Sequence, residues 1–291
     1  MFCYRSNTPF LSYFGINLDT SLLLILALTG LISGFYSGMV GSGGNVILIP
    51  ILDYVLYQYG LRDDLLVKSI IAHSLVVTFF LGIIVSYRQY LERNFHLKEV
   101  VATAILGMIS ATIMTWLINN GTWYQKSDFD IVFAIMLFLL ILKLVLDKKS
   151  GLTDENKTES KGWLLGIGGI TGVVTSLSGL GGGIILIPGF TDIMKMSLKQ
   201  ASSISISVIC LLSLPIGISY MIATPDQAID LPLQVGYISF SVVLATLMGV
   251  LVSAPFGVRA SHRVNPRVIK MIFAAVVTTL LVKMIYAISV F

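Results

Sequence analysis

Two stretches of the sequence decide the fold: Gly34 to Pro50 reads GFYSGMVGSGGNVILIP, and Gly172 to Pro188 reads GVVTSLSGLGGGIILIP. In each stretch a cluster of glycines precedes a short apolar segment that ends in Ile-Leu-Ile-Pro. Aligning the two prolines gives a constant offset of 138 residues, the difference between 188 and 50. This offset superimposes Gly34 on Gly172, Gly41 on Gly179, Gly43 on Gly181 and Gly44 on Gly182. The shared pattern predicts two halves that arose by duplication.

The composition is that of a membrane protein. The chain of 291 residues is 56% hydrophobic and only 12% charged. Soluble domains carry about a quarter charged residues and an apolar share below about one half. The charges gather between apolar stretches of about twenty residues, the length of a helix that spans a bilayer. The net charge of +4 comes from Lys and Arg in loops, which favours cytoplasmic loops over nucleic-acid binding.

Apolar segments occur in two series that are separated by the one sustained hydrophilic stretch, Asp147 to Lys161. The first series lies at 20–40, 45–58, 67–87, 98–118 and 129–146. The second series lies at 162–178, 183–194, 200–223, 233–257 and 268–290. We therefore expect an N-terminal tail at 1–19 that is not a cleaved signal, a first repeat at 20–146, a linker at 147–161 and a second repeat at 162–291.

Loop charge predicts opposite orientations for the two repeats. The loop at 88–98, the linker and the loop at 259–270 hold most of the basic residues, so we expect them in the cytoplasm. The segment at 67–87 then begins outside, whereas its counterpart at 200–223 begins inside, next to Lys195 and Lys199. Inverted repeats of this kind are common in secondary transporters.

One segment in each half, 45–58 and 183–194, is too short to cross a hydrocarbon core of about 30 Å. Each of them forms a hairpin with the longer segment before it, and the short arm is either re-entrant or part of a tilted, broken span. The expected fold class is an all-α polytopic membrane protein with two inverted-topology repeats. Each repeat comprises a broken or re-entrant helical hairpin plus three transmembrane helices.

The glycine breaks between the hairpin arms are candidate substrate-binding sites. Unsatisfied backbone costs several kcal/mol in a bilayer, so these breaks are expected to face protein or a water-lined cavity. Glycine permits backbone in which successive N–H groups converge, and the following helix adds its positive end, which suits a small anion. The candidate residues are Gly41, Ser42, Gly43, Gly44, Asn45, Gly179, Gly181, Gly182 and Gly183. Close helix packing is the alternative, and we prefer it for Gly34, Gly38 and Gly172.

Three polar residues inside apolar segments complete the candidate substrate-binding set: His73, Ser74 and Ser205. His73 would take up protons or donate to an anion, and a histidine satisfied by packing is the equal alternative. Ser74 and Ser205 occupy matching positions in the repeat, and the same alignment pairs Lys68 with Lys199. The two serines would bind substrate oxygens, or else bond to their own helix backbone.

Four charged residues lie at segment ends, and we interpret them as interfacial. Asp53 and Asp192 follow the two repeat prolines and are expected at helix ends, with coupling to a cation as the alternative. Lys68 and Lys199 are expected to extend toward the lipid headgroups, with a role at the entrance for an anion as the alternative.

Catalytic, metal and cofactor sites are not expected. The three histidines, His73, His96 and His262, lack the spacing of metal ligands, and no P-loop motif is present. The two cysteines, Cys3 and Cys210, suggest neither a disulfide framework nor a metal site. A membrane-embedded enzyme would need paired acids or a nucleophile with a base inside the spans, and the carboxylates lie mostly in loops.

The two copies of G-x-x-[ST]-x-x-x-G-x-G-G-x-x-I-L-I-P resemble the TauE/SafE family of sulfite and organosulfonate permeases, from about residue 20 to 290. The resemblance implies a carrier in the inner or plasma membrane for sulfur oxyanions or related organic anions. Asn45, His73 and Ile204 depart from the family pattern, so they bear on the choice of substrate.

The expected function is secondary transport of a small anion by alternating access at the paired breaks, with an anion channel or facilitator as the alternative. The expected partners are the anion, the lipid bilayer and a coupling ion, either a proton or sodium. The sequence leaves import versus export and a homodimeric state open.

Overall fold

The computed structural model describes residues 20–40, 44–121, 123–146, 161–225, 231–261 and 274–285. The first half contains α2 (Thr20–Val40), α3 (Asn45–Gln58), α4 (Asp63–Leu91), α5 (Leu97–Asn120) and α6 (Lys126–Leu146). The second half contains α7 (Lys161–Ser178), α8 (Gly183–Pro188), the π-helical turn η2 (Gly189–Ile193), α9 (Leu198–Ile222), strands β1 (Gln234–Val235) and β2 (Ile238–Ser239), α10 (Phe240–Ser261) and a helix over Ala274–Ile285. Five of the described helices, α2, α4, α5, α9 and α10, are long and apolar enough to cross a membrane. The predicted all-α polytopic class is confirmed.

Helix α4 illustrates how the sequence sets the element boundaries. Asp63 and Asp64 occupy its first turn and Arg88 its last, which places each charge at the favourable end of the helix dipole. Its counterpart α9 is capped by Ser197, whose side chain accepts a hydrogen bond from the Gln200 amide. Both helices therefore start where a capping or acidic residue satisfies the first turn, and both run longer than the apolar segments alone.

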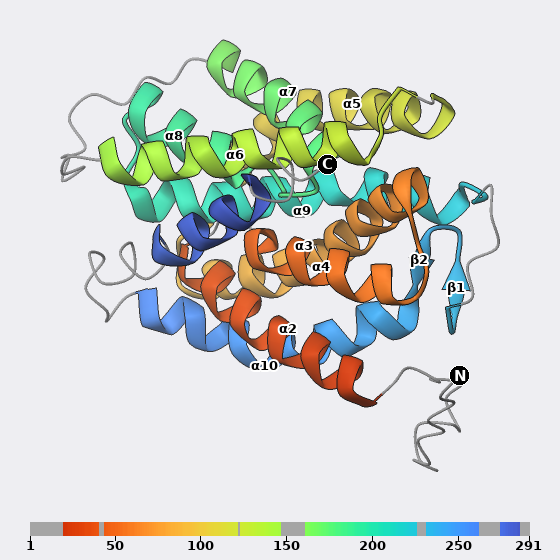
Figure 1. Ribbon diagram of the computed structural model, residues 1–291. Helices are drawn as coiled ribbons and strands as arrows, with labels where there is room; N and C mark the ends of the chain where they lie inside the picture. Colours follow the sequence, from red (N-terminus) through yellow and green to blue (C-terminus); the bar gives the residue numbers. More distant parts are fainter. Residues whose placement is uncertain are drawn as a thin grey trace, which may run out of the picture.

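The helices pack in pairs that join one half to the other (Figure 1). Helix α2 packs most extensively against α10, α5 against α7, and α4 against α9. In repeat order, α2 corresponds to α7, α4 to α9 and α5 to α10. Exchanging every helix for its counterpart leaves this set of pairs unchanged, as expected for two related halves. The inverted orientation of the halves remains a prediction.

The buried apolar side chains form two cores that follow the same correspondence. The larger core joins side chains mainly of α2, α3, α4, α6 and α10, with some from α5 and α9, and the smaller core joins α5, α7, α8, η2 and α9. Each core therefore combines side chains from both halves. Neither half can complete its core alone, which ties the halves into one unit.

Three repeat glycines allow helices to approach closely. A Cβ atom on Gly34 would come within 2.9 Å of the Val250 backbone of α10, and one on Gly38 would meet the carbonyl oxygen of Ala254. A Cβ atom on Gly172 would meet the Gly107 carbonyl of α5. The predicted packing role of these glycines is confirmed.

The predicted apolar segment at 233–257 is wrong at its start. Residues 234–239 form the antiparallel hairpin β1–β2, and α10 begins only at Phe240. Gly236 adopts a φ of 59°, and a side chain there would collide with the Tyr220 carbonyl at the end of α9. This tight turn breaks a helix that the hydrophobic composition alone would have continued.

Several sequence predictions lie outside the described residues. The tail at 1–19, most of the linker at 147–161 and the ends of the last predicted segment are among them. The division into two repeats with a cytoplasmic linker therefore stays a prediction.

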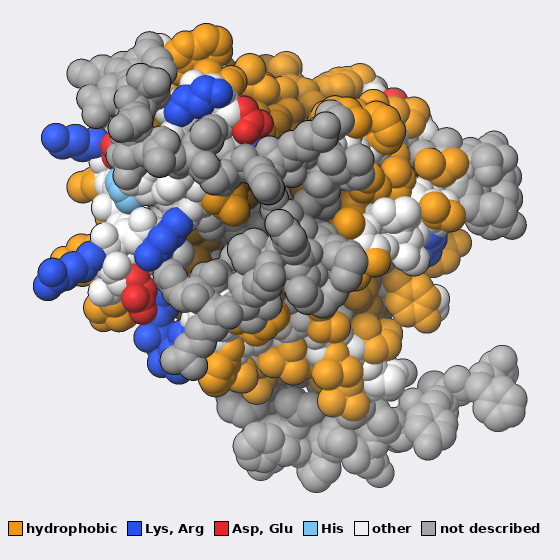
Figure 2. Space-filling model, turned by 90° about the vertical axis from the view of Figure 1, so that its left-hand side faces the viewer, with side chains coloured by type: hydrophobic (Ala, Val, Ile, Leu, Met, Phe, Trp, Pro, Cys, Tyr) orange, Lys and Arg blue, Asp and Glu red, His pale blue; other side chains and the backbone are white. Residues whose placement is uncertain are grey.

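The basic loop between α4 and α5 and the basic segment that leads into α9 lie at the same end of the bundle. The side-chain amide of Asn94, between α4 and α5, donates to the Lys199 carbonyl at 3.1 Å, and Ser203 donates to the Asn94 carbonyl. Exposed basic side chains of these loops and of α10 are Arg93, Lys98, Lys195, Lys199 and Arg259. Figure 2 shows several Lys and Arg side chains along one margin of the view, whereas hydrophobic side chains cover much of the rest of the described surface. The juxtaposition fits the prediction that both loops face the cytoplasm.

Candidate functional site

Both short helices begin immediately after a glycine with left-handed backbone. Gly44 precedes α3 with a φ of 65°, and Gly182 precedes α8 with a φ of 73°. These glycines are equivalent in the repeat. A Cβ atom on Gly44 would lie 2.5 Å from the Ser33 carbonyl oxygen, and one on Gly182 would lie 2.7 Å from the Thr175 hydroxyl. Conformation and space both require glycine here, which explains why the sequence repeats it.

The hydroxyl-bearing residues that pack against the two cap glycines also match in the repeat. Ser37 of α2 packs against Gly44, and Thr175 of α7 packs against Gly182. Both side chains are fully buried, and neither hydroxyl has a hydrogen-bond partner in the described part of the chain. A buried hydroxyl without a partner costs about 1–3 kcal/mol, so these two are candidates to bind a ligand. The sequence analysis missed both; their equal offset from the glycines was the available signal.

The break in the second half contacts the first half through Asn45. Its side-chain amide donates to the Gly179 carbonyl at 2.6 Å, across 134 residues of sequence. The hydroxyl of Thr78 in α4 donates to the Asn45 side-chain oxygen at 2.7 Å, which fixes the orientation of the amide. The Ser74 hydroxyl donates to the Ile71 carbonyl and lies 3.3 Å from the Gly179 carbonyl. Asn45, Ser74, Thr78 and Gly179 therefore form one buried polar cluster.

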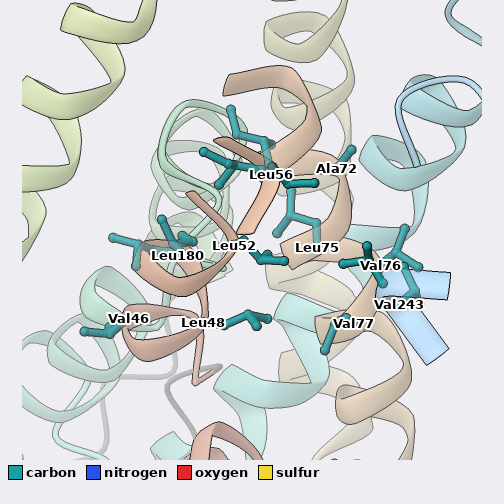
Figure 3. Packing of buried hydrophobic residues seen from close by; sticks show 14 of the residues in the cluster. Val46, Leu48, Leu52, Leu56, Ala72, Leu75, Val76, Val77, Leu180 and Val243 are labelled. Atoms are coloured by element: carbon teal, nitrogen blue, oxygen red, sulfur yellow. The ribbon is translucent and has the colours of Figure 1, made fainter. Parts of the chain in front are cut away.

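The second break is held between the halves by Leu180. Gly179 and Gly181 have φ values of 66° and 80°, so the chain turns on either side of this leucine. The Leu180 side chain is 1% exposed and belongs to the core formed by α3 and α4. Figure 3 shows Leu180 next to the α3 ribbon, among the labelled residues of this core. An apolar anchor in the opposite half thus keeps a left-handed stretch of backbone in place.

The structure describes only some of the remaining predicted site residues. Gly41, Ser42 and Gly43 lie outside the described residues, and Gly183 is the first residue of α8. The Ser205 hydroxyl is buried and has no partner among the described residues.

His73 is fully buried and uses both of its ring nitrogens. The Ser239 amide of β2 donates to Nε2 at 2.8 Å, and Nδ1 lies 2.6 Å from the Ser69 carbonyl. Because Nε2 accepts, the proton lies on Nδ1, and the ring joins the hairpin to α4. This arrangement favours the packing role that the sequence left open.

Helix α6 holds the short arms of both halves by ion pairs. Lys126, at its start, lies 3.2 Å from Asp53 of α3, and Lys143, near its end, lies 3.3 Å from Asp192 of η2. The two lysines are 17 residues apart, which corresponds to about 25 Å along the helix. Both aspartates therefore pair with lysines of a single helix; Asp192 lies near the end of η2, whereas Asp53 lies inside α3 and not at its end.

A buried tyrosine links the loop after α5 to the second break. The Tyr124 hydroxyl donates to the Leu177 carbonyl at 2.6 Å, two residues before Gly179. Burial, with Asp128 and Asp130 nearby, raises the pKa of the Tyr124 phenol, so the hydroxyl keeps its proton and the bond.

The profile of the family described as sulfite exporter TauE/SafE matches residues 25–284. The chain belongs to the TauE/SafE family. The match includes both glycine breaks and every helix contact described above. No solved structure gives a significant match.

Relatives in the TauE/SafE family extend over nearly the whole chain. A probable membrane transporter protein of Methanocaldococcus jannaschii is 26% identical over 255 residues, which are 88% of this chain and 92% of the relative. A probable membrane transporter protein of Haemophilus influenzae is 25% identical over 256 residues, with 87% and 94% coverage. The probable membrane transporter protein YunE of Bacillus subtilis is 23% identical over 284 residues, with 90% and 97% coverage. With its apolar helices, the protein is therefore a multi-pass membrane transporter of the cell membrane.

Proposed function

We propose that the protein is a secondary transporter that moves a small anion, sulfite or an organosulfonate, by alternating access at the two glycine breaks. The observation that carries the proposal is the matched pair of left-handed cap glycines, Gly44 and Gly182, packed on the unpartnered hydroxyls of Ser37 and Thr175. Main-chain amides at such breaks supply partial positive charge without a titratable group.

The chemistry of the surroundings supports an uncharged cradle for the anion. Ser74, Thr78, Ser205 and Asn45 add hydroxyl and amide groups, all buried, to the main chain of the breaks. Oxygens of a sulfite or sulfonate group accept hydrogen bonds, which these donors can provide after small rotations. A neutral cradle binds such an anion strongly enough to select it and weakly enough to release it.

The ion pairs of α6 support movement between two states. Each pair joins α6 to the short arm of one half, at opposite ends of the helix. Ion pairs that are partly exposed contribute about 0–1 kcal/mol, so either one can open at little cost. We propose that they open alternately, as one break and then the other becomes accessible.

The test is flux of radiolabelled sulfite and sulfoacetate into liposomes that contain the purified protein. The proposal expects flux that saturates with concentration and is accelerated by unlabelled anion on the opposite side. Imposed proton or sodium gradients then identify the coupling ion. Flux that rises linearly without exchange would favour the channel alternative, and absence of flux for both anions and for a wider anion panel would refute the proposal.

A further inference from the structure

Lys68 of α4 is a charged residue that is buried in the protein interior. Its side chain was expected to extend toward lipid headgroups, but the residue is 2% exposed, so that expectation is wrong. The ammonium lies 2.9 Å from Asp64, whose side chain is 40% exposed, and 5.8 Å from the centre of the Tyr237 ring. An ammonium has three donors, and a buried one needs strong compensation. A single half-solvated carboxylate and one ring face provide only part of it.

A buried phenol without a partner lies in the same cluster. Tyr220 of α9 is fully buried and packs edge-on against Tyr237 at 5.9 Å between ring centres. Its hydroxyl has no hydrogen-bond partner in the described residues, and the same holds for Oδ1 of Asp64. Asp64 and Tyr124 both lie within electrostatic range of this phenol. A phenylalanine would fill the space without leaving a hydroxyl unsatisfied, so packing alone does not explain Tyr220.

The cluster has one member at the protein surface and includes Lys68, which lies on the same helix as Ser74 of the polar cluster around Gly179. Lys68 precedes Ser74 by six residues, about 9 Å along α4. Tyr124, which is near Tyr220, donates to the Leu177 carbonyl next to the break. Asp64, at the outer end of the cluster, is the member in contact with solvent. The Tyr237 ring contacts both Lys68 and Tyr220, and Asp64 connects this cluster to solvent.

We propose that Lys68 and Tyr220 form a second, peripheral binding site for the transported anion, an oxyanion of the sulfite or sulfonate type. The inference rests on the proposed function and adds a site at which the anion stops before it reaches the glycine breaks. The anion oxygens accept hydrogen bonds from the Lys68 ammonium and the Tyr220 hydroxyl. Asp64 pairs with Lys68 while the site is empty and turns to solvent when the anion takes its place.

The charge of the cluster selects against other ligands. A sodium ion would meet the Lys68 ammonium, and an apolar solute would leave the ammonium and the phenol unsatisfied. An oxyanion satisfies both donors at once, and charge-assisted hydrogen bonds are among the stronger ones in proteins. Because the anion replaces Asp64 as the acceptor, the Lys68 ammonium stays paired while the anion enters.

The test compares transport kinetics of radiolabelled sulfite and sulfoacetate in proteoliposomes with equal amounts of protein. Lys68→Gln and Tyr220→Phe should each raise the KM for uptake about tenfold, the loss of one charge-assisted hydrogen bond, and Lys68→Arg should keep it within about threefold. Lys199→Gln is the matched control, because Lys199 aligns with Lys68 in the repeat but is exposed. Its KM should equal that of the unmodified protein.

The variants separate binding from folding. Tyr220→Phe removes an unpartnered hydroxyl, so its thermal unfolding should occur at or above the midpoint of the unmodified protein while its KM rises. An unchanged KM in Tyr220→Phe, or equal KM increases in Lys68→Gln and Lys199→Gln, would overturn this inference and leave the proposed function intact. Absence of saturable flux in the unmodified protein would overturn both.

Discussion

Replacement of Gly182 by alanine tests the reasoning about the breaks most sharply, because two costs add at this position. Its φ of 73° costs a residue with a side chain about 1–2 kcal/mol. The added Cβ would lie 2.7 Å from the Thr175 hydroxyl and closer still to the Thr171 side chain, and overpacking of this kind costs about 1–3 kcal/mol. We expect Gly182→Ala to lower the free energy of unfolding by about 2–5 kcal/mol.

Two other glycines serve as matched controls. Gly60 has a φ of 85° but nothing within 4 Å of a Cβ atom, so Gly60→Ala should cost only the conformational part, about 1–2 kcal/mol. Gly166 lies within α7 and is also free of contacts, so Gly166→Ala should be neutral or stabilise the helix by about 0.5–1 kcal/mol.

The assay is reversible unfolding of the purified variants in mixed detergent micelles, followed by sulfite flux in liposomes. We expect Gly182→Ala to be the least stable of the three and the one with reduced flux. The reasoning would be refuted if Gly182→Ala were no less stable than Gly60→Ala, or if it transported sulfite with unchanged KM.

Three further predictions concern individual polar side chains. Asn45→Ala should lower the free energy of unfolding by about 1–3 kcal/mol, since it removes the buried hydrogen bonds to the Gly179 carbonyl and from the Thr78 hydroxyl, and it should raise the KM for sulfite; denaturant unfolding and flux measure the two effects. His73→Ala should destabilise the protein by roughly 2–5 kcal/mol at every pH at which it folds, through two lost hydrogen bonds and a cavity, and a loss of sulfite binding without a loss of stability would contradict its packing role. Asp53→Asn should change the free energy of unfolding by about 1 kcal/mol or less while altering the maximal transport rate, and a large loss of stability with an unaltered rate would count against an ion pair that opens during transport.

The sequence predicted most of the helical architecture because the apolar segments are long and the loops are charged. Segments 20–40, 45–58 and 162–178 coincide with α2, α3 and α7 to within one residue. The cap glycines were also predictable, because a position that requires positive φ in a confined space is occupied by glycine in both repeats. Helix ends were less predictable at α4, where Asp63 and Asp64 extend the helix beyond its apolar part.

The features that the sequence did not predict depend on contacts between distant residues. The hydrogen bond from Asn45 to Gly179 arises only when the two halves pack, and the second repeat copy has Gly183 at the position of Asn45. The hairpin at 234–239 has a hydrophobic composition like that of a span, and its turn depends on Gly236, whose positive φ and close approach to the end of α9 leave no room for a side chain. Lys68 resembled an interfacial lysine until its ion pair and the Tyr237 ring placed it in the interior.

The most direct test of the central claim is a crystal structure of the protein soaked with selenite, in which the anomalous signal of selenium locates the oxyanion. The account predicts a principal peak between the two breaks, within hydrogen-bonding distance of the backbone next to Gly44 or Gly182 and of the hydroxyl of Ser37 or Thr175. Principal peaks confined to the exposed basic loops, with the two breaks empty at saturating selenite, would contradict it.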